Sequence, residues 1–207
     1  PDGDVSRWEK VLKRLILLNK NYPLKGIECN SFNFDKEFKG THDKEKIINI
    51  IKKVALQEKL VFFGGYCLSF YSKYYKLLKI SNTPDFDLLS NNPKETVNKI
   101  ETELNKESIN SKIIFHEAIG ENIPYHYEIK INNNSVALIY KTEACYNYNN
   151  IKINNKIYRI ATIDTLLSFY LAFYYTKQSR YDKNRLLCIS EYIFKIQQKK
   201  RLSQKGV

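Results

Sequence analysis

Residues 60–68, Leu-Val-Phe-Phe-Gly-Gly-Tyr-Cys-Leu, and residues 84–89, Pro-Asp-Phe-Asp-Leu-Leu, decide the fold of this chain. The first stretch is a β-rich apolar run that ends on a Gly-Gly pair, after which apolar residues recur at helical spacing. The second stretch predicts a short strand. Because side chains alternate along a strand, Asp85 and Asp87 project from one face, while Phe86 points the other way, into the core.

This pair of carboxylates, together with the two glycines, predicts a metal-dependent nucleotide site. Two carboxylates on one face repel each other unless a cation lies between them, and oxygen ligands suit Mg²⁺, which keeps waters and shares substrate phosphates. Gly64 and Gly65 allow the backbone to approach a triphosphate closely, and the N-terminus of the following helix offers N–H groups to anionic oxygens. Either motif alone is a weak signal. Their order, with a helix between them, is much more specific.

The order strand, Gly-Gly, helix, Asp-x-Asp resembles the polymerase-β-like nucleotidyltransferases. The resemblance implies a third carboxylate, usually Asp, on a later strand of the same sheet. In the expected strand 125–131 this position falls on Glu128, which is one methylene longer than the usual residue, and Glu117 and Glu143 are alternatives. The resemblance assigns Asp85, Asp87 and Glu128 as catalytic and metal-binding groups, and Gly64 and Gly65 as nucleotide-binding groups.

Three longer runs are similar to the poly(A) polymerases of large cytoplasmic DNA viruses. They are residues 84–90, residues 140–149 and residues 160–173, and the last is the most specific. This resemblance implies a template-independent adenylyltransferase that adds AMP from ATP to mRNA 3′ ends with two Mg²⁺ (or Mn²⁺) ions. The implied partners are ATP and an RNA 3′ end, with a homodimer as the candidate assembly and no membrane. The implied location is the cytoplasm, in a viral factory or virion.

Two other functions fit the same motifs. The acceptor could be a tRNA end, a protein or a small molecule instead of an mRNA. Alternatively, the chain could be a catalytically silent RNA-binding subunit that has kept the fold, although the intact Asp-x-Asp pair argues against this.

The succession of elements predicts an α+β protein, with a mixed sheet, flanking helices and a closing helical region. We expect an N-terminal helical region over 1–59, including a helix at 5–20, a nucleotidyltransferase domain over 60–160 and a helical region over 161–207. Family members are longer, so we expect the last region to be truncated. Asn92-Pro93-x-Glu95 is a strong helix start, and Asn132–Ser135 and Asn154-Asn155 are expected hairpin connections.

Charge and cysteine usage narrow the classes of function. The formal net charge of +12 favours a polyanionic partner, because each phosphate that a basic protein neutralises releases counterions. No apolar run reaches the roughly 18–20 residues that a membrane-spanning helix needs. Four scattered cysteines and three histidines without ligand spacing predict buried free thiols, with neither a disulfide framework nor a zinc site.

Overall fold

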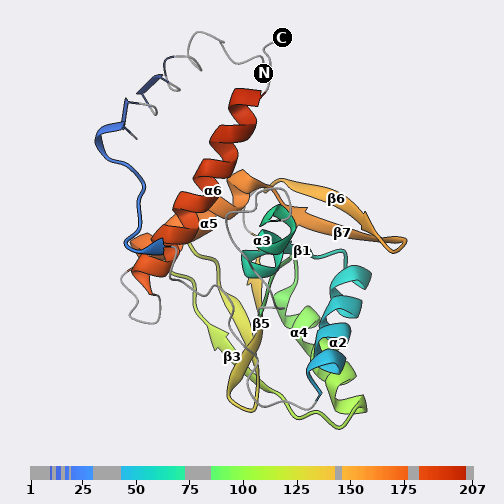
Figure 1. The fold of residues 1–207 in the computed structure, drawn as a ribbon. Helices are drawn as coiled ribbons and strands as arrows, with labels where there is room; N and C mark the ends of the chain where they lie inside the picture. The colour runs from blue at the N-terminus through green and yellow to red at the C-terminus, as the bar shows by residue number, and fades with distance from the viewer. Residues whose placement is uncertain are drawn as a thin grey trace.

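A computed structural model of the chain describes residues 10, 13, 14, 17, 18, 20–29, 43–72, 85–142, 146–176 and 182–203, with side chains to residue 197. Seven strands form one mixed sheet in the order β3-β4-β5-β2-β1-β7-β6 (Figure 1). Each helix within these residues is too short or too polar to cross a bilayer.

The strands are β1 (Val61–Phe63), β2 (Phe86–Ser90), β3 (Lys112–His116), β4 (His126–Ile131), β5 (Asn134–Lys141), β6 (Tyr148–Ile153) and β7 (Lys156–Ala161). The helices are α2 (Lys44–Gln57), α3 (Gly64–Ser72), α4 (Pro93–Lys106), α5 (Ile163–Tyr175) and α6 (Lys183–Ser203).

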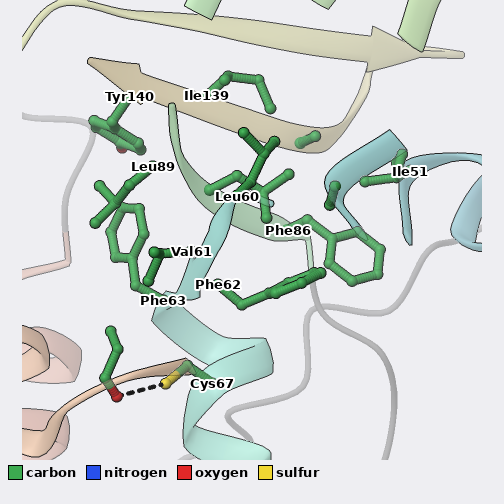
Figure 2. Close-up of a cluster of buried hydrophobic side chains, with 14 of the residues drawn as sticks. Ile51, Leu60, Val61, Phe62, Phe63, Cys67, Phe86, Leu89, Ile139 and Tyr140 are labelled. Atoms are coloured by element: carbon green, nitrogen blue, oxygen red, sulfur yellow. Dashed lines mark hydrogen bonds between the residues drawn. The ribbon is translucent and has the colours of Figure 1, made fainter. Parts of the chain in front are cut away.

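The short central strand β1 connects the two halves of the sheet. It runs antiparallel to β2 on one side and parallel to β7 on the other, with Val61 opposite both Leu89 and Arg159. Its three residues are buried, which is typical of a strand covered on both faces. Figure 2 shows the side chains that pack around it, and the thiol of Cys67 lies 3.4 Å from the carbonyl oxygen of Ala161, at the end of β7.

Neighbouring residues of β1 point to opposite faces of the sheet, and each meets different helices. The ring of Phe62 packs against Tyr66 of α3, with centroids 5.2 Å apart, and near Phe86. The ring of Phe63 instead lies 4.6 Å from that of Phe169 in α5. Because Phe63 is in register with Asp87, helix α5 covers the sheet face that carries the acidic pair.

The local signals in the sequence are confirmed at the turns and at one helix start. Asn92 is the N-cap of α4, and its side chain accepts a hydrogen bond from the backbone N–H of Glu95. The β4–β5 connection turns through Asn132 and Asn133, and the β6–β7 connection turns through Asn154-Asn155, all with φ between 48° and 62°. Asparagine tolerates this left-handed conformation better than most residues do. The predicted helix 5–20 falls largely outside the described residues.

The segment before α2 is attached to helix α6. The side chain of Asn184 exchanges two hydrogen bonds with the backbone of Ile27, and Glu191 accepts one from the N–H of Gly26. A disulfide joins Cys29 to Cys188 across 159 residues of sequence. The prediction of free thiols was therefore wrong for this pair, because spacing along the chain does not show that the two segments pack together. It is confirmed for Cys67, which is buried and unpaired, whereas Cys145 lies outside the described residues.

Helix α2, which belongs to the predicted N-terminal region, packs against α4 and buries Ile47 and Ile51 in the same core as the sheet. At the other boundary, β7 ends at Ala161 and α5 begins at Ile163, so the change from strands to helices falls near residue 160. The division into the regions 1–59, 60–160 and 161–207 stays a prediction.

Candidate functional site

The site begins where β1 turns into α3, because the backbone of Gly64 lies directly against the carboxylate of Asp87. Phe63 and Asp87 are paired across β1 and β2, which brings the next residue, Gly64, over the Asp87 side chain. Gly64 has φ +62°, and a Cβ atom built on it would lie 2.6 Å from Cγ of Asp87 and closer still to Oδ2. Only glycine fits here, on grounds of both backbone conformation and space. Gly65 follows as the second residue of α3.

Asp85 immediately precedes β2 and completes the acidic pair. Both aspartates are half-buried, whereas the ring of Phe86 between them is fully buried on the opposite face. That ring packs against Tyr66, with centroids 5.0 Å apart. The predicted alternation is thus present, with an aromatic anchor on one side of β2 and two carboxylates on the other.

The third predicted carboxylate, Glu128, lies on the same face of the sheet as Asp87, but two strands away. Leu138 of β5 is opposite Asp87 on β2, and it is also opposite Glu128 on β4. The three residues therefore share a face, and two strand spacings, about 10 Å, separate the backbones of Asp87 and Glu128. The intervening strand β5 carries neither Asp nor Glu.

In this structure the carboxylate of Glu128 is engaged by other groups. Its Oε2 lies 2.9 Å from Nε2 of His116, and its Oε1 lies 3.5 Å from Nζ of Lys130. Burial acts to raise the pKa of Glu128, but the hydrogen bond from His116 and the charge of Lys130 outweigh it and hold the pKa below its ordinary value. Glu128 is therefore ionised near neutral pH.

Of the two alternatives to Glu128, the described one, Glu117, does not join the pair. Glu117 is exposed and follows β3, the strand at the edge of the sheet, and Glu143 lies outside the described residues. Within the described part of the chain, no group of three His, Cys, Asp or Glu side chains is close enough to hold a metal ion. The structure thus brings together Gly64, Asp85 and Asp87, and leaves Glu128 two strands away.

Helix α5 adds a residue that the sequence analysis missed. Burial raises the pKa of the Tyr170 hydroxyl, and the charges of Asp87 and Asp85 raise it further, while Arg185 of α6 acts in the opposite direction. Tyr170 is therefore near the acidic pair, on the helix that covers this face of the sheet. Tyr170 lies in the apolar run 160–173 of the sequence. A buried hydroxyl in such a run was the available signal.

A pocket of about 300 Å³ lies on the same side of the sheet, between the end of β2 and helix α5. Its lining includes Leu89, which shares the face of Asp87, and the ring of Phe169. Polar groups also converge on it. They are Glu121, Asn122, Lys141, Thr142, Tyr146, Thr165 and Ser168.

The chain matches no known protein-family profile and no curated protein sequence. Among solved structures, it is similar to the Megavirus polyadenylate synthase, with a TM-score of 0.71 and 19% sequence identity over 97% of this chain. The match covers 42% of the Megavirus chain, so this chain spans less than half of that protein. The similarity establishes the fold, which is shared with that synthase: an α+β mixed sheet with flanking helices, as predicted.

A structure of ANT(2″)-Ia in complex with adenylyl-2″-tobramycin also aligns, over 77% of this chain and 97% of that one. The identity is 15% and the TM-score is 0.37. An alignment this loose assigns no residue.

Proposed function

We propose that this protein is a nucleotidyltransferase that transfers AMP from ATP to the 3′ end of RNA. The observation that carries the proposal is the contact between Gly64 and the carboxylate of Asp87, with Asp85 on the same face. This contact gives a physical reason for a Gly-Gly turn at this point. The turn lies at the start of helix α3.

The two aspartates fit a divalent metal ion. Mg²⁺ in phosphoryl-transfer enzymes is held by one or two carboxylates together with substrate phosphates, and Asp85 and Asp87 supply that set. When bound, Mg²⁺ or Mn²⁺ would neutralise charge on the triphosphate and lower the pKa of the RNA 3′-hydroxyl. Glu128 remains the proposed third carboxylate. Its hydrogen bond with His116 and its ion pair with Lys130 would have to open for it to serve in that role.

The residues of this chain would bind and orient the substrates. Gly64 and Gly65 would allow the triphosphate to approach the backbone at the start of α3, where the helix dipole favours anionic oxygens. The pocket beside Leu89 has the volume expected of a small-ligand site and is the space available on this face for the nucleoside. Phe169 and Tyr170 of α5, which covers this face of the sheet, would exclude water from the reacting groups. Exclusion of water favours transfer to RNA over hydrolysis.

RNA is the proposed acceptor for two reasons. The net charge of +12 favours a polyanion, and the fold is that of a viral polyadenylate synthase. Adenylation of mRNA in the cytoplasm of an infected cell is the specific form of this proposal.

The test is transfer to a labelled oligo(A) primer, with Mg²⁺ and each of the four NTPs supplied separately. We expect extension with ATP, and a loss of about a thousandfold or more in Asp85→Asn and in Asp87→Asn. Thermal melts of both variants show whether the loss of activity is separate from any loss of stability. Asp43→Asn is the matched control, since Asp43 is exposed and its side chain does not cap α2.

Each other outcome points to a different function. Wild-type activity in either aspartate variant would remove these residues from the mechanism. Transfer to a tRNA, a protein or a small molecule, but not to oligo(A), would keep the nucleotidyltransferase and change its acceptor. RNA binding without transfer of any NTP would indicate a silent subunit of the same fold.

A further inference from the structure

A basic groove lies away from the acidic pair, between helix α2 and the β6–β7 hairpin. Its volume is about 1070 Å³, which exceeds the usual range for a small-molecule pocket. The hairpin and α2 can be seen next to each other in Figure 1. Five cationic side chains are among the lining residues, and none of the described lining residues is Asp or Glu: the five are Lys52, Lys53, Lys59, Lys156 and Arg159.

Two of these cations are held in place by aromatic rings. The ammonium group of Lys52 lies 5.1 Å from the ring centre of Tyr66 and 6.0 Å from that of Phe86, and burial lowers the pKa of Lys52. The guanidinium of Arg159 lies 4.9 Å from the ring centre of Tyr148 and donates a hydrogen bond of 3.0 Å to the carbonyl of Lys59. Cation–π contacts orient a charge without neutralising it, so both cations remain available to an anion.

The groove differs from the neighbouring helix α4, where two lysines form ion pairs with glutamates. On α4, Lys99 pairs with Glu58 and Glu95, and Lys106 pairs with Glu103. Of the five groove cations, Lys53 also pairs with Glu103. For the other four, the described residues supply no ion pair. A concave surface with unneutralised cations concentrates anions, because its walls focus the field.

The groove reaches the back of the proposed active site. Lys52 lies over Phe86, which stands between Asp85 and Asp87 on the opposite face of β2. A polyanion in the groove would therefore lie across the sheet from the acidic pair. Asn150 and Asn155 line the groove and offer hydrogen bonds. Tyr148 lies against Arg159 but does not line the groove, and its exposed ring offers stacking, as in surfaces that bind single strands without reading sequence.

We propose that this groove binds the phosphate backbone of single-stranded RNA upstream of its 3′ end. The direction in which the RNA runs through the groove rests on the proposed adenylyl transfer. RNA binding by the groove is independent of that proposal, because binding is measured without catalysis.

The test compares two double variants that change the net charge equally. Lys59→Glu with Lys156→Glu alters two exposed lysines of the groove. Lys94→Glu with Lys112→Glu alters two exposed lysines elsewhere, neither of which is ion-paired to a described residue. Binding is measured as fluorescence anisotropy of a labelled 20-nucleotide oligo(A) over a range of salt concentrations, after thermal melts show that both variants are folded.

We expect the groove variant to bind RNA at least tenfold more weakly at low salt and the control variant less than threefold more weakly. The slope of log K against log salt should become shallower by about 1.4 in the groove variant, since each single-strand phosphate contact contributes about 0.7. Equal losses in both variants, or no loss in the groove variant, would overturn the proposal. If polyglutamate, but not RNA, loses affinity in the groove variant, the groove binds an acidic protein segment instead.

The same assay separates this proposal from the proposed function. If the wild type transfers no nucleotide but binds RNA through Lys59 and Lys156, the groove assignment stands and the catalytic proposal fails. If the wild type transfers AMP and the groove variant is unchanged in binding and in KM for RNA, the catalytic proposal stands alone.

Discussion

Gly64 shows how one residue joins backbone conformation to chemistry. Its positive φ sets the direction in which β1 passes into α3, and its missing Cβ leaves room for the Asp87 carboxylate. Both requirements are met because glycine lacks a Cβ atom, so no other residue type satisfies both.

Gly64→Ala should therefore cost both stability and activity. The left-handed conformation costs a non-glycine residue about 1–2 kcal/mol, and the collision with Asp87 adds to that cost and displaces the carboxylate. Gly120→Ala is a close control, because Gly120 has φ +56° but its Cβ would meet no atom within 4 Å. Thermal melts should place Gly64→Ala clearly below Gly120→Ala, and only Gly64→Ala should lose adenylyl transfer. Equal melting temperatures would mean that Asp87 moves aside without cost.

At the scale of elements, the sequence predicts most of the fold and the centre of the site. Alternation around Phe86 and the cap at Asn92 are local signals, and both predictions are confirmed. The position of β5 between β2 and β4 is a long-range property that spacing along the chain does not contain. The partners of Glu128 and the approach of Tyr170 depend on such packing. For that reason the sequence could neither place Glu128 relative to the aspartates nor identify Tyr170.

The variant Glu128→Gln tests whether Glu128 is a metal ligand or only an ion-pair partner within the β3–β4 hairpin. If Glu128 completes the metal site, kcat should fall by about tenfold to a hundredfold while the affinity for ATP changes little. His116→Gln, which removes the partner but not the carboxylate, should retain most of the activity. Similar turnover in Glu128→Gln and wild type would assign Glu128 to the hairpin alone.

The pH dependence of stability tests the ion pair separately. The folded-state pKa of Glu128 lies below its ordinary value, so the ionised form stabilises the folded state at neutral pH. That contribution is present above the unfolded pKa, near 4.5, and is lost as the pH falls through the folded pKa. The difference in melting temperature between wild type and Glu128→Gln should therefore be at its full size above pH 4.5 and shrink as the pH falls below that value. A difference independent of pH would contradict the ion pair.

At the scale of the whole molecule, the disulfide between Cys29 and Cys188 attaches the N-terminal segment to α6, which packs on α5 above the acidic pair. A crosslink that closes a long loop stabilises chiefly by restricting the unfolded chain, typically by about 2–4 kcal/mol. A reducing agent should lower the melting temperature of the wild type and leave Cys29→Ser with Cys188→Ser unchanged. Identical melting curves for both proteins in both conditions would mean that the pair does not crosslink in solution.

The position of β1 between β2 and β7 also determines when the site can form during synthesis. Val61 pairs with Arg159, and β2 pairs in parallel with β5, so the strands that hold Gly64 and Asp87 are completed by segments made much later. Closing such long loops is slow, because chain entropy must be lost before the new contacts repay it. A nascent chain still missing β7 would expose one edge of β1 and could not bury Cys67 against Ala161. Nucleotide binding should thus arise late on the ribosome, after the β6–β7 hairpin has emerged.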